Sequence, residues 1–163
     1  MDVLKRPHTV LGDDLEGFYR NKCVAITGAA GSIGSALAEA FARFDCRRLV
    51  LLDHFDHGLL DVVERVGRID RRVELVDALC DVRDGERVAR WFDRVRPDVV
   101  IHAAALKHVH LGERHPGECV LTNLVGVRNV LAAAQGAGAS AFTLVSSDKA
   151  ASPVCVMGAT KRL

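Results

Sequence analysis

The order of apolar runs along this chain predicts an α/β fold built on a doubly wound parallel sheet. Five short runs rich in β-branched residues alternate with longer segments that carry the helical spacing of apolar residues. The runs are apolar on both faces, which is typical of strands covered by helices on either side of a sheet. Right-handed connections between parallel strands then favour the Rossmann-like strand order 3-2-1-4-5.

Each expected strand is a compact apolar run bounded by polar or small residues. The first, CVAIT, leads directly into glycines, and the fourth follows Pro97, which stops the helix before it. The five strands are expected at Cys23–Thr27, at Leu49–Asp53, within Val73–Val82, at Asp98–Ala105 and at Ala141–Ser147.

The expected helices are indicated by apolar residues that recur on one face. In the first helix, Ile33, Leu37 and Phe41 have this spacing, and the glycines of QGAGAS end the longest one. Because the chain stops a few residues into its last helix, we expect the fold to be truncated after the fifth strand. The helices are expected at Ser32–Phe44, Leu59–Val66, about Gly85–Val95, roughly Pro116–Gln135, and from near Met157.

Composition is that of a globular protein with one domain. The 163 residues include 22 Lys plus Arg and 21 Asp plus Glu, and a formal net charge of +1 argues against a nucleic-acid binder. No run approaches about 18 consecutive apolar residues, so no membrane-spanning segment is expected. The five cysteines are scattered and never in C-x-x-C spacing, which indicates reduced thiols in a cytoplasmic protein.

The strongest local motif is TGAAGSIG, which directly follows the first expected strand. Gly28 permits a sharp turn, Gly31 lets the backbone approach a pyrophosphate, and Gly34 allows close packing of helix on strand. The next helix begins here and offers free N–H groups to phosphates. A purely structural turn is the alternative, but the position between strand and helix favours a dinucleotide site. The expected contacts are Thr27, Gly28, Ala30, Gly31, Ser32, Ile33 and Gly34.

Two acidic residues follow the next two strands. A carboxylate at Asp53 accepts hydrogen bonds from both adenosine ribose hydroxyls and repels a 2′-phosphate, which favours NAD over NADP. Asp81 is expected at the adenine amine, with the N–H of Val82 beside it. The alternatives are an ordinary strand-terminal Asp and, for DVRD, a helix N-cap. We therefore expect an N-terminal lead-in over residues 1–21 and an NAD(P)-binding Rossmann domain over residues 22–163.

Three further segments carry a family resemblance. HAAALKHV, TNLVGVRNV and SSDKAASPVCVMGATKR, together with the glycine turn and Asp53, resemble the CapD-like nucleotide-sugar 4,6-dehydratases of bacterial polysaccharide biosynthesis. These enzymes belong to the extended short-chain dehydrogenase/reductase superfamily, and the resemblance runs from Lys22 to the end of the chain. It implies a UDP-N-acetylhexosamine substrate, which is oxidised at C4 by bound NAD(P)⁺, loses water across C5 and C6, and regains the hydride at C6.

The resemblance also implies roles for individual residues. Asp148 is expected to act as the acid at the C6 hydroxyl and Lys149 as the base at C5. Ser147 is expected to hydrogen-bond the C4 oxygen, and Lys161 to hold the nicotinamide ribose. A solvated ion pair in a loop is the alternative for Asp148 and Lys149.

Other matched positions are expected around the cofactor and the substrate. Ala103 and Ala104 belong to the cofactor contacts, Lys107 to cofactor or substrate phosphate, and Asn123 to the substrate site. A surface lysine and a buried structural asparagine are the alternatives for the last two. Met157 stands where the superfamily has a catalytic tyrosine. Because a thioether carries no proton, the C4 proton must leave by another route.

Other residue patterns in the chain do not favour a metal site or a nucleic-acid patch. His108, His110 and His115 have no supporting Cys or carboxylate cluster, so no metal site is expected, and these histidines are expected in a loop. The run Arg65–Arg72 lacks interleaved aromatic residues and is expected to be a solvated helix end rather than a nucleic-acid patch. A nucleotide-sugar epimerase remains the alternative enzyme.

The family pattern extends beyond the segments present in this sequence. The resemblance implies a C-terminal substrate-binding part and, in the larger relatives, an N-terminal membrane region, and we expect both to lie outside this sequence. We therefore expect these residues to be the cofactor-binding half, which binds NAD without turning over a sugar nucleotide. A degenerate, non-catalytic dinucleotide-binding module is the alternative. The resemblance also allows a homo-oligomer.

Overall fold

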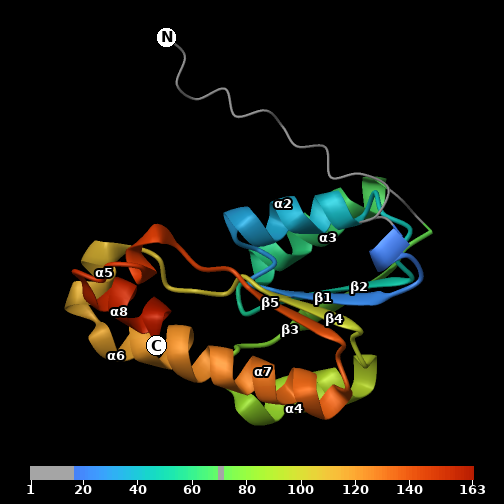
Figure 1. Ribbon diagram of the computed structural model, residues 1–163. Helices are drawn as coiled ribbons and strands as arrows, with labels where there is room; N and C mark the ends of the chain where they lie inside the picture. The colour runs from blue at the N-terminus through green and yellow to red at the C-terminus, as the bar shows by residue number, and fades with distance from the viewer. Residues whose placement is uncertain (1–16, 70–71) are drawn as a thin grey trace.

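A computed structural model describes residues 17–69 and 72–163, and it confirms the doubly wound sheet (Figure 1). All strands run parallel in the predicted order β3-β2-β1-β4-β5. Most of the expected lead-in lies outside the described residues. The strands are β1 (Cys23–Thr27), β2 (Arg48–Asp53), β3 (Glu74–Leu79), β4 (Val99–His102) and β5 (Ala141–Leu144).

Helices cover both faces of the sheet and extend past one end of it (Figure 1). On one face lie α2 (Ser32–Phe41) and α3 (Asp56–Ile69), and on the other α4 (Gly85–Val95) and α7 (Gly126–Ala137). The remaining short elements gather into a lobe at one end of the sheet. They are α5 (Val109–Arg114), α6 (Pro116–Val120), the π-helical turn η1 (Leu121–Val125), the 3₁₀ turn η2 (Asp148–Ala150) and α8 (Val156–Arg162).

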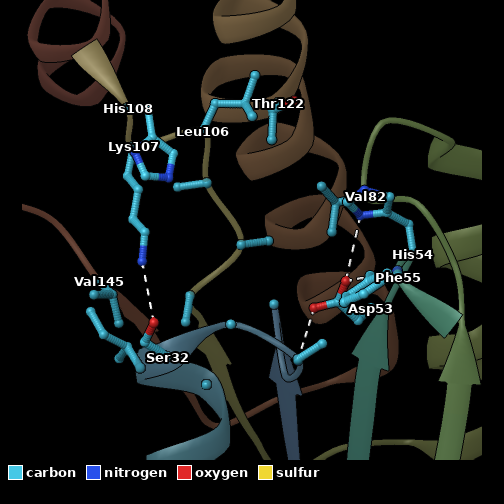
Figure 2. A pocket seen from close by; sticks show the side chains of 18 of the residues that line it. Ser32, Asp53, His54, Phe55, Val82, Leu106, Lys107, His108, Thr122 and Val145 are labelled. Carbon is cyan, nitrogen blue, oxygen red and sulfur yellow. Dashed lines mark hydrogen bonds and ion pairs between the residues drawn. The ribbon is translucent and has the colours of Figure 1, made fainter. Parts of the chain in front are cut away.

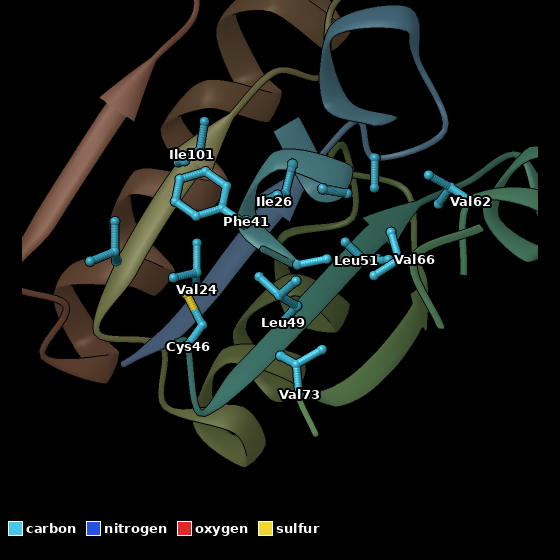
Figure 3. Packing of buried hydrophobic residues seen from close by; sticks show 14 of the residues in the cluster. Val24, Ile26, Phe41, Cys46, Leu49, Leu51, Val62, Val66, Val73 and Ile101 are labelled. Atoms are coloured by element: carbon cyan, nitrogen blue, oxygen red, sulfur yellow. The ribbon is translucent and has the colours of Figure 1, made fainter. Parts of the chain in front are cut away.

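The central strands are buried on both sides because their side chains alternate between two cores. Val24 and Ile26 of β1 belong to the core under α2 and α3 (Figure 3). Ala25, between them, belongs to the core under α4 and α7. The edge strands are partly exposed, so the expectation of strands apolar on both faces holds for β1, β2 and β4 but not for β3 and β5.

The turn after β1 depends on two glycines. Gly28 has φ +69°, and a Cβ there would lie 2.5 Å from the backbone nitrogen of Ala104. A Cβ on Gly34 would collide with the backbone of Gly28 and Ala29. The turn therefore seats the first residues of α2 directly against the ends of β1 and β4.

Three expectations about the helices were wrong. The helix expected over Pro116–Gln135 is divided into α6, η1 and α7, because a π-helical turn changes the hydrogen bonding around the buried Asn123. The histidine segment expected as a loop contains α5, in which Gly112 packs against the Cys119 sulfur of α6. The first helix ends at Phe41 rather than Phe44 because the chain turns there to enter β2.

His102 is fully buried at the end of β4, with its Nδ1 2.8 Å from the Thr27 hydroxyl of β1. Within the described part of the chain, its Nε2 atom has no hydrogen-bond partner. Burial, with a smaller contribution from the charge of Lys161, lowers the pKa of His102 to about 4.

Because the pKa of His102 is lowered in the folded chain, we expect the protein to lose stability in mild acid. Between pH 6.5 and about pH 4, the unfolded chain takes up a proton at His102 that the folded chain does not bind. The free energy of unfolding should therefore fall by about 3 kcal/mol across this interval. Urea denaturation at a series of pH values measures it. His102→Asn cannot titrate and should lose this part of the slope. An unchanged slope in the variant would contradict the assignment.

Candidate dinucleotide-binding cleft

A cleft of about 790 Å³ opens at the carboxyl ends of the strands. It lies where β1 and β4 lead their connections to opposite sides, which is where doubly wound sheets bind ligands. Its size is within the range of small-molecule and cofactor sites. In Figure 2, Asp53, Phe55 and Val82 lie along one side, and Lys107, His108 and Val145 along the other.

The glycine turn forms the floor of the cleft. Gly31 is the residue before α2, with φ −75° and ψ 165°, and it has no side chain to cap the helix. The N–H groups of the first turn of a helix have no partners within that helix. Here Ser32, Ile33 and Gly34 line the cleft. The turn can therefore hold an anionic group on backbone N–H donors and the positive end of the helix dipole.

Asp53 joins the end of β2 to this turn. Its Oδ2 accepts the Ala30 N–H at 2.9 Å, and its Oδ1 accepts the Phe55 N–H at 3.0 Å. The residue is only 8% exposed, yet it lines the cleft. The same carboxylate thus fixes the turn and presents negative charge to a ligand.

The loop after β3 contributes Asp81, Val82 and Arg83 to the cleft. Burial of Asp81 opposes its ionisation, but hydrogen bonds from the Arg83 side chain and backbone outweigh burial and hold the pKa of this carboxyl below its usual value. Asp84, next in the chain, accepts from Arg87 N–H and caps α4. The N-cap alternative for DVRD therefore applies to its second aspartate.

Lys107 and Lys161 approach the cleft from two different segments. Lys107 follows β4, and its Nζ lies 3.4 Å from the Ser32 hydroxyl across the cleft (Figure 2). Lys161 lies on α8 and donates from Nζ to the carbonyl of Val145 at 3.1 Å. Burial lowers the pKa of Lys161. The buried Met157, one turn earlier on α8, also lines the cleft.

The segment after β5 is the most exposed part of the site. Ser147 and Lys149 line the cleft, but Asp148 does not. Lys149 Nζ lies 3.3 Å from Asp148 Oδ1, and their side chains are 47% and 86% exposed. The two residues thus form an exposed ion pair at the edge of the cleft.

Asn123 is 3% exposed and bridges three segments from the π-helical turn. Its Oδ1 accepts the Leu106 N–H at 2.9 Å, and its Nδ2 donates to the Leu106 carbonyl and to Thr160 Oγ1, both at 3.0 Å. Asn123 does not line the cleft. Asn123 thereby fixes the segment that follows β4 against α8. The first of these carries Lys107 and the second carries Lys161.

Most residues expected at the cofactor line the cleft, including Ala103 and Ala104. Thr27 does not, because its side chain is buried against His102. Sequence reasoning missed cleft residues that come from the same strand ends or from α6 and η1. Proximity to a strand end was an available signal for the first group. The missed residues are His54, Phe55, Cys80, Arg83, Ala105, Leu106, His108, Glu118, Thr122, Val145 and Ser146.

The sequence of this chain is similar to the sequences of known proteins. Residues 24–163 match the family described as polysaccharide biosynthesis protein. The probable polysaccharide biosynthesis protein EpsC of Bacillus subtilis is 37% identical over 159 residues, which cover 97% of this chain and 27% of that protein. The UDP-N-acetylglucosamine 4,6-dehydratase (inverting) of Campylobacter jejuni is 34% identical, over 88% of this chain and 41% of its own length.

The fold is also shared with solved structures. The crystal structure of a UDP-glucose-4-epimerase from Stenotrophomonas maltophila, with bound NAD and formylated UDP-arabinopyranose, has a TM-score of 0.76 and 30% identity. The match covers 86% of this chain and 46% of that one. The chain thus spans less than half the length of each of these relatives.

Because Asn123 bridges Leu106 and α8, we expect its removal to lower the free energy of unfolding measurably. Asn123→Ala leaves the N–H and carbonyl of Leu106 without their partners, so the free energy of unfolding should fall by about 2–3 kcal/mol. Gln135→Ala, at an exposed position on α7, is the matched control and should change stability by less than about 0.5 kcal/mol. Denaturant titration of both variants tests this, and equal stability of the two would contradict the bridge.

Proposed function

Because this chain belongs to the polysaccharide biosynthesis protein family, as its motifs predicted, we propose that it binds NAD in the cleft as part of a nucleotide-sugar 4,6-dehydratase. The observation that carries the proposal is the convergence of the glycine turn, Asp53 and Lys161 on one cleft. The substrate proposed is a UDP-N-acetylhexosamine, in line with the dehydratase relative.

The residues of the cleft fit a dinucleotide. Gly31 has no side chain, and among the described residues a Cβ there would have only the Gly28 carbonyl oxygen within 4 Å, at 3.2 Å. A pyrophosphate can therefore approach this backbone closely. The ribose of adenosine would meet Asp53, whose negative charge opposes the phosphate of NADP. The charge of Lys161 suits the nicotinamide end. These features support NAD rather than NADP.

In the proposed reaction, a dinucleotide held by the glycine turn, Asp53 and Lys161 would supply the hydride chemistry, so that a hydride leaves C4 of the sugar and is restored at C6. Lys149 takes the C5 proton, and Asp148 gives a proton to the C6 hydroxyl, which leaves as water. Ser147 holds the C4 oxygen by a hydrogen bond, and the C4 hydroxyl proton passes to solvent at this exposed position. Lys149 returns its proton to C5 when the hydride reaches C6. Met157 takes no part in proton transfer because its thioether has no exchangeable proton. Lys161, with its lowered pKa, lies near enough to the cleft to influence these groups by its charge.

A dinucleotide-binding module without turnover is the second candidate. It is favoured by the exposure of Asp148 and Lys149, since a lysine base needs a dry site to lower its pKa. An epimerase is supported by the shared fold of the UDP-glucose-4-epimerase, but the Ser-x-Asp-Lys segment resembles the dehydratases.

The compartment proposed for the protein is the cytoplasm. All five cysteines are free, which suits a reducing compartment. Among the described residues, no helix is long and apolar enough to cross a membrane. A homo-oligomer is compatible with the partly exposed edge strand β5.

The cofactor proposal predicts binding by the 163-residue chain itself. NAD should bind at least roughly tenfold more tightly than NADP, a difference of about 1.4 kcal/mol. Isothermal titration calorimetry with both dinucleotides measures this. Gly31→Val should abolish binding of either, whereas Gly136→Val, at a position with nothing within 4 Å, should leave affinity unchanged. Equal affinities for NAD and NADP would contradict the role of Asp53.

The reaction proposal concerns the full translation product of the gene that encodes this chain. Lys149→Ala should stop formation of the 4-keto-6-deoxy product from UDP-N-acetylglucosamine and should stop solvent deuterium exchange at C5. NAD affinity should stay within about twofold, because the cofactor contacts are elsewhere. Mass spectrometry measures both the 4-keto-6-deoxy product and the deuterium incorporated at C5. Exchange at C5 that persists at the wild-type rate would show that Lys149 is not the base.

A further inference from the structure

Arg83 lies between two carboxylates on the rim of the cleft. Its Nε and Nη2 donate to Asp81 Oδ2 at 2.8 and 2.6 Å, and its Nη1 donates to Glu118 Oε2 of α6 at 2.7 Å. All three residues line the cleft. A guanidinium is planar and presents its donors in a fixed fork, so two anchored edges leave it little freedom.

The backbone of this loop is held without the Arg83 side chain. Asn129 of α7 donates from Nδ2 to the carbonyls of Val82 and Arg83, at 3.1 and 3.0 Å. A Cβ on Gly126 would lie 2.8 Å from Val82, so α7 packs directly on the loop. The side chain of Arg83 is therefore not needed to place the loop. What it holds, together with the Arg83 backbone N–H, is the Asp81 carboxylate.

The contacts of Asp81 leave one acceptor position open. Within residues 17–69 and 72–163, Oδ2 receives two N–H groups of Arg83, while Oδ1 receives only the Arg83 backbone N–H, at 2.9 Å. A carboxylate oxygen accepts two hydrogen bonds, so Oδ1 keeps a lone pair for a donor in the cleft. The ionised Asp81, held by Arg83, has no proton to donate. A ligand group at this place must therefore itself be a hydrogen-bond donor.

We propose that Arg83, braced by Glu118, is a positioning residue that orients Asp81 to accept a hydrogen bond from the amino group of a purine. This inference rests on the proposed function, since the purine is that of the bound dinucleotide. The contact of Asp81 with the adenine amine is already expected from the sequence, and what is new is that Arg83 sets how well this contact discriminates. With Arg83 in place, the chain selects a purine with a 6-amino group over one with a 6-oxo group, because a carbonyl oxygen would face the Asp81 carboxylate without a proton between them.

The test compares NAD with nicotinamide hypoxanthine dinucleotide, in which oxygen replaces the amino group. By calorimetry, wild-type chain should bind NAD roughly tenfold or more tightly than the hypoxanthine analogue. Arg83→Met removes the fork but keeps the length of the side chain. It should lower NAD affinity roughly fivefold to tenfold, leave affinity for the analogue unchanged, and so lose most of the discrimination.

Controls separate positioning from a general loss of structure. Arg90→Met removes a cation on α4 that pairs with Glu86 and does not line the cleft, and it should leave both affinities unchanged. Glu118→Gln should reduce discrimination less than Arg83→Met, because the two bonds to Asp81 remain. The unfolding transition of each variant shows that it is folded.

Each outcome decides between the proposals. If Arg83→Met weakens both dinucleotides equally, or neither, the positioning role is overturned. If wild-type chain binds NAD and the analogue equally, the purine specificity is overturned while the cofactor proposal stands. If wild-type chain binds neither, the cofactor proposal fails and this inference fails with it.

Discussion

The close approach of the ends of β1 and β4 is the constraint on which the rest of the structure depends. Gly28 can lie against Ala104 only because it has no side chain and tolerates φ +69°. Just before it, the Thr27 hydroxyl and buried His102 join the same two strands. Because the connections after these strands turn to opposite sides, the space between them becomes the cleft.

Polar groups around the cleft are fixed to different degrees. On the glycine-turn side, Asp53 holds two backbone N–H groups and is almost fully buried. Behind the opposite wall, Asn123 ties Leu106 to α8. Among the described residues, the side chains of Asp148 and Lys149 bond only to each other and are open to solvent. The side chains at the strand ends, where a ligand would bind, are therefore held more firmly than those at η2, where the chemistry is proposed.

Local patterns predicted the sheet, the glycine turn and most of the cleft, because strands, glycine positions and strand-end carboxylates are set by neighbours in sequence. The π-helical turn could not be predicted this way, since it depends on Asn123 reaching Leu106 and Thr160. The pair of Arg83 and Glu118 joins residues 35 positions apart, so it follows from how α6 packs rather than from either local pattern. Thr27 was expected at the ligand because the motif contains it, yet its hydroxyl is used by His102.

The central claim is that a dinucleotide binds across the ends of β1 and β4, with its phosphates on the first turn of α2. A ¹H–¹⁵N NMR titration of the chain with NAD tests this most directly. The account predicts that the amide signals of Ser32, Ile33 and Gly34 shift most, followed by those after β2 and β3. The amides of the exposed arginines on α4, such as Arg90 and Arg94, should not move. Shifts confined to α4, or saturable binding that leaves the α2 amides unchanged, would contradict the account.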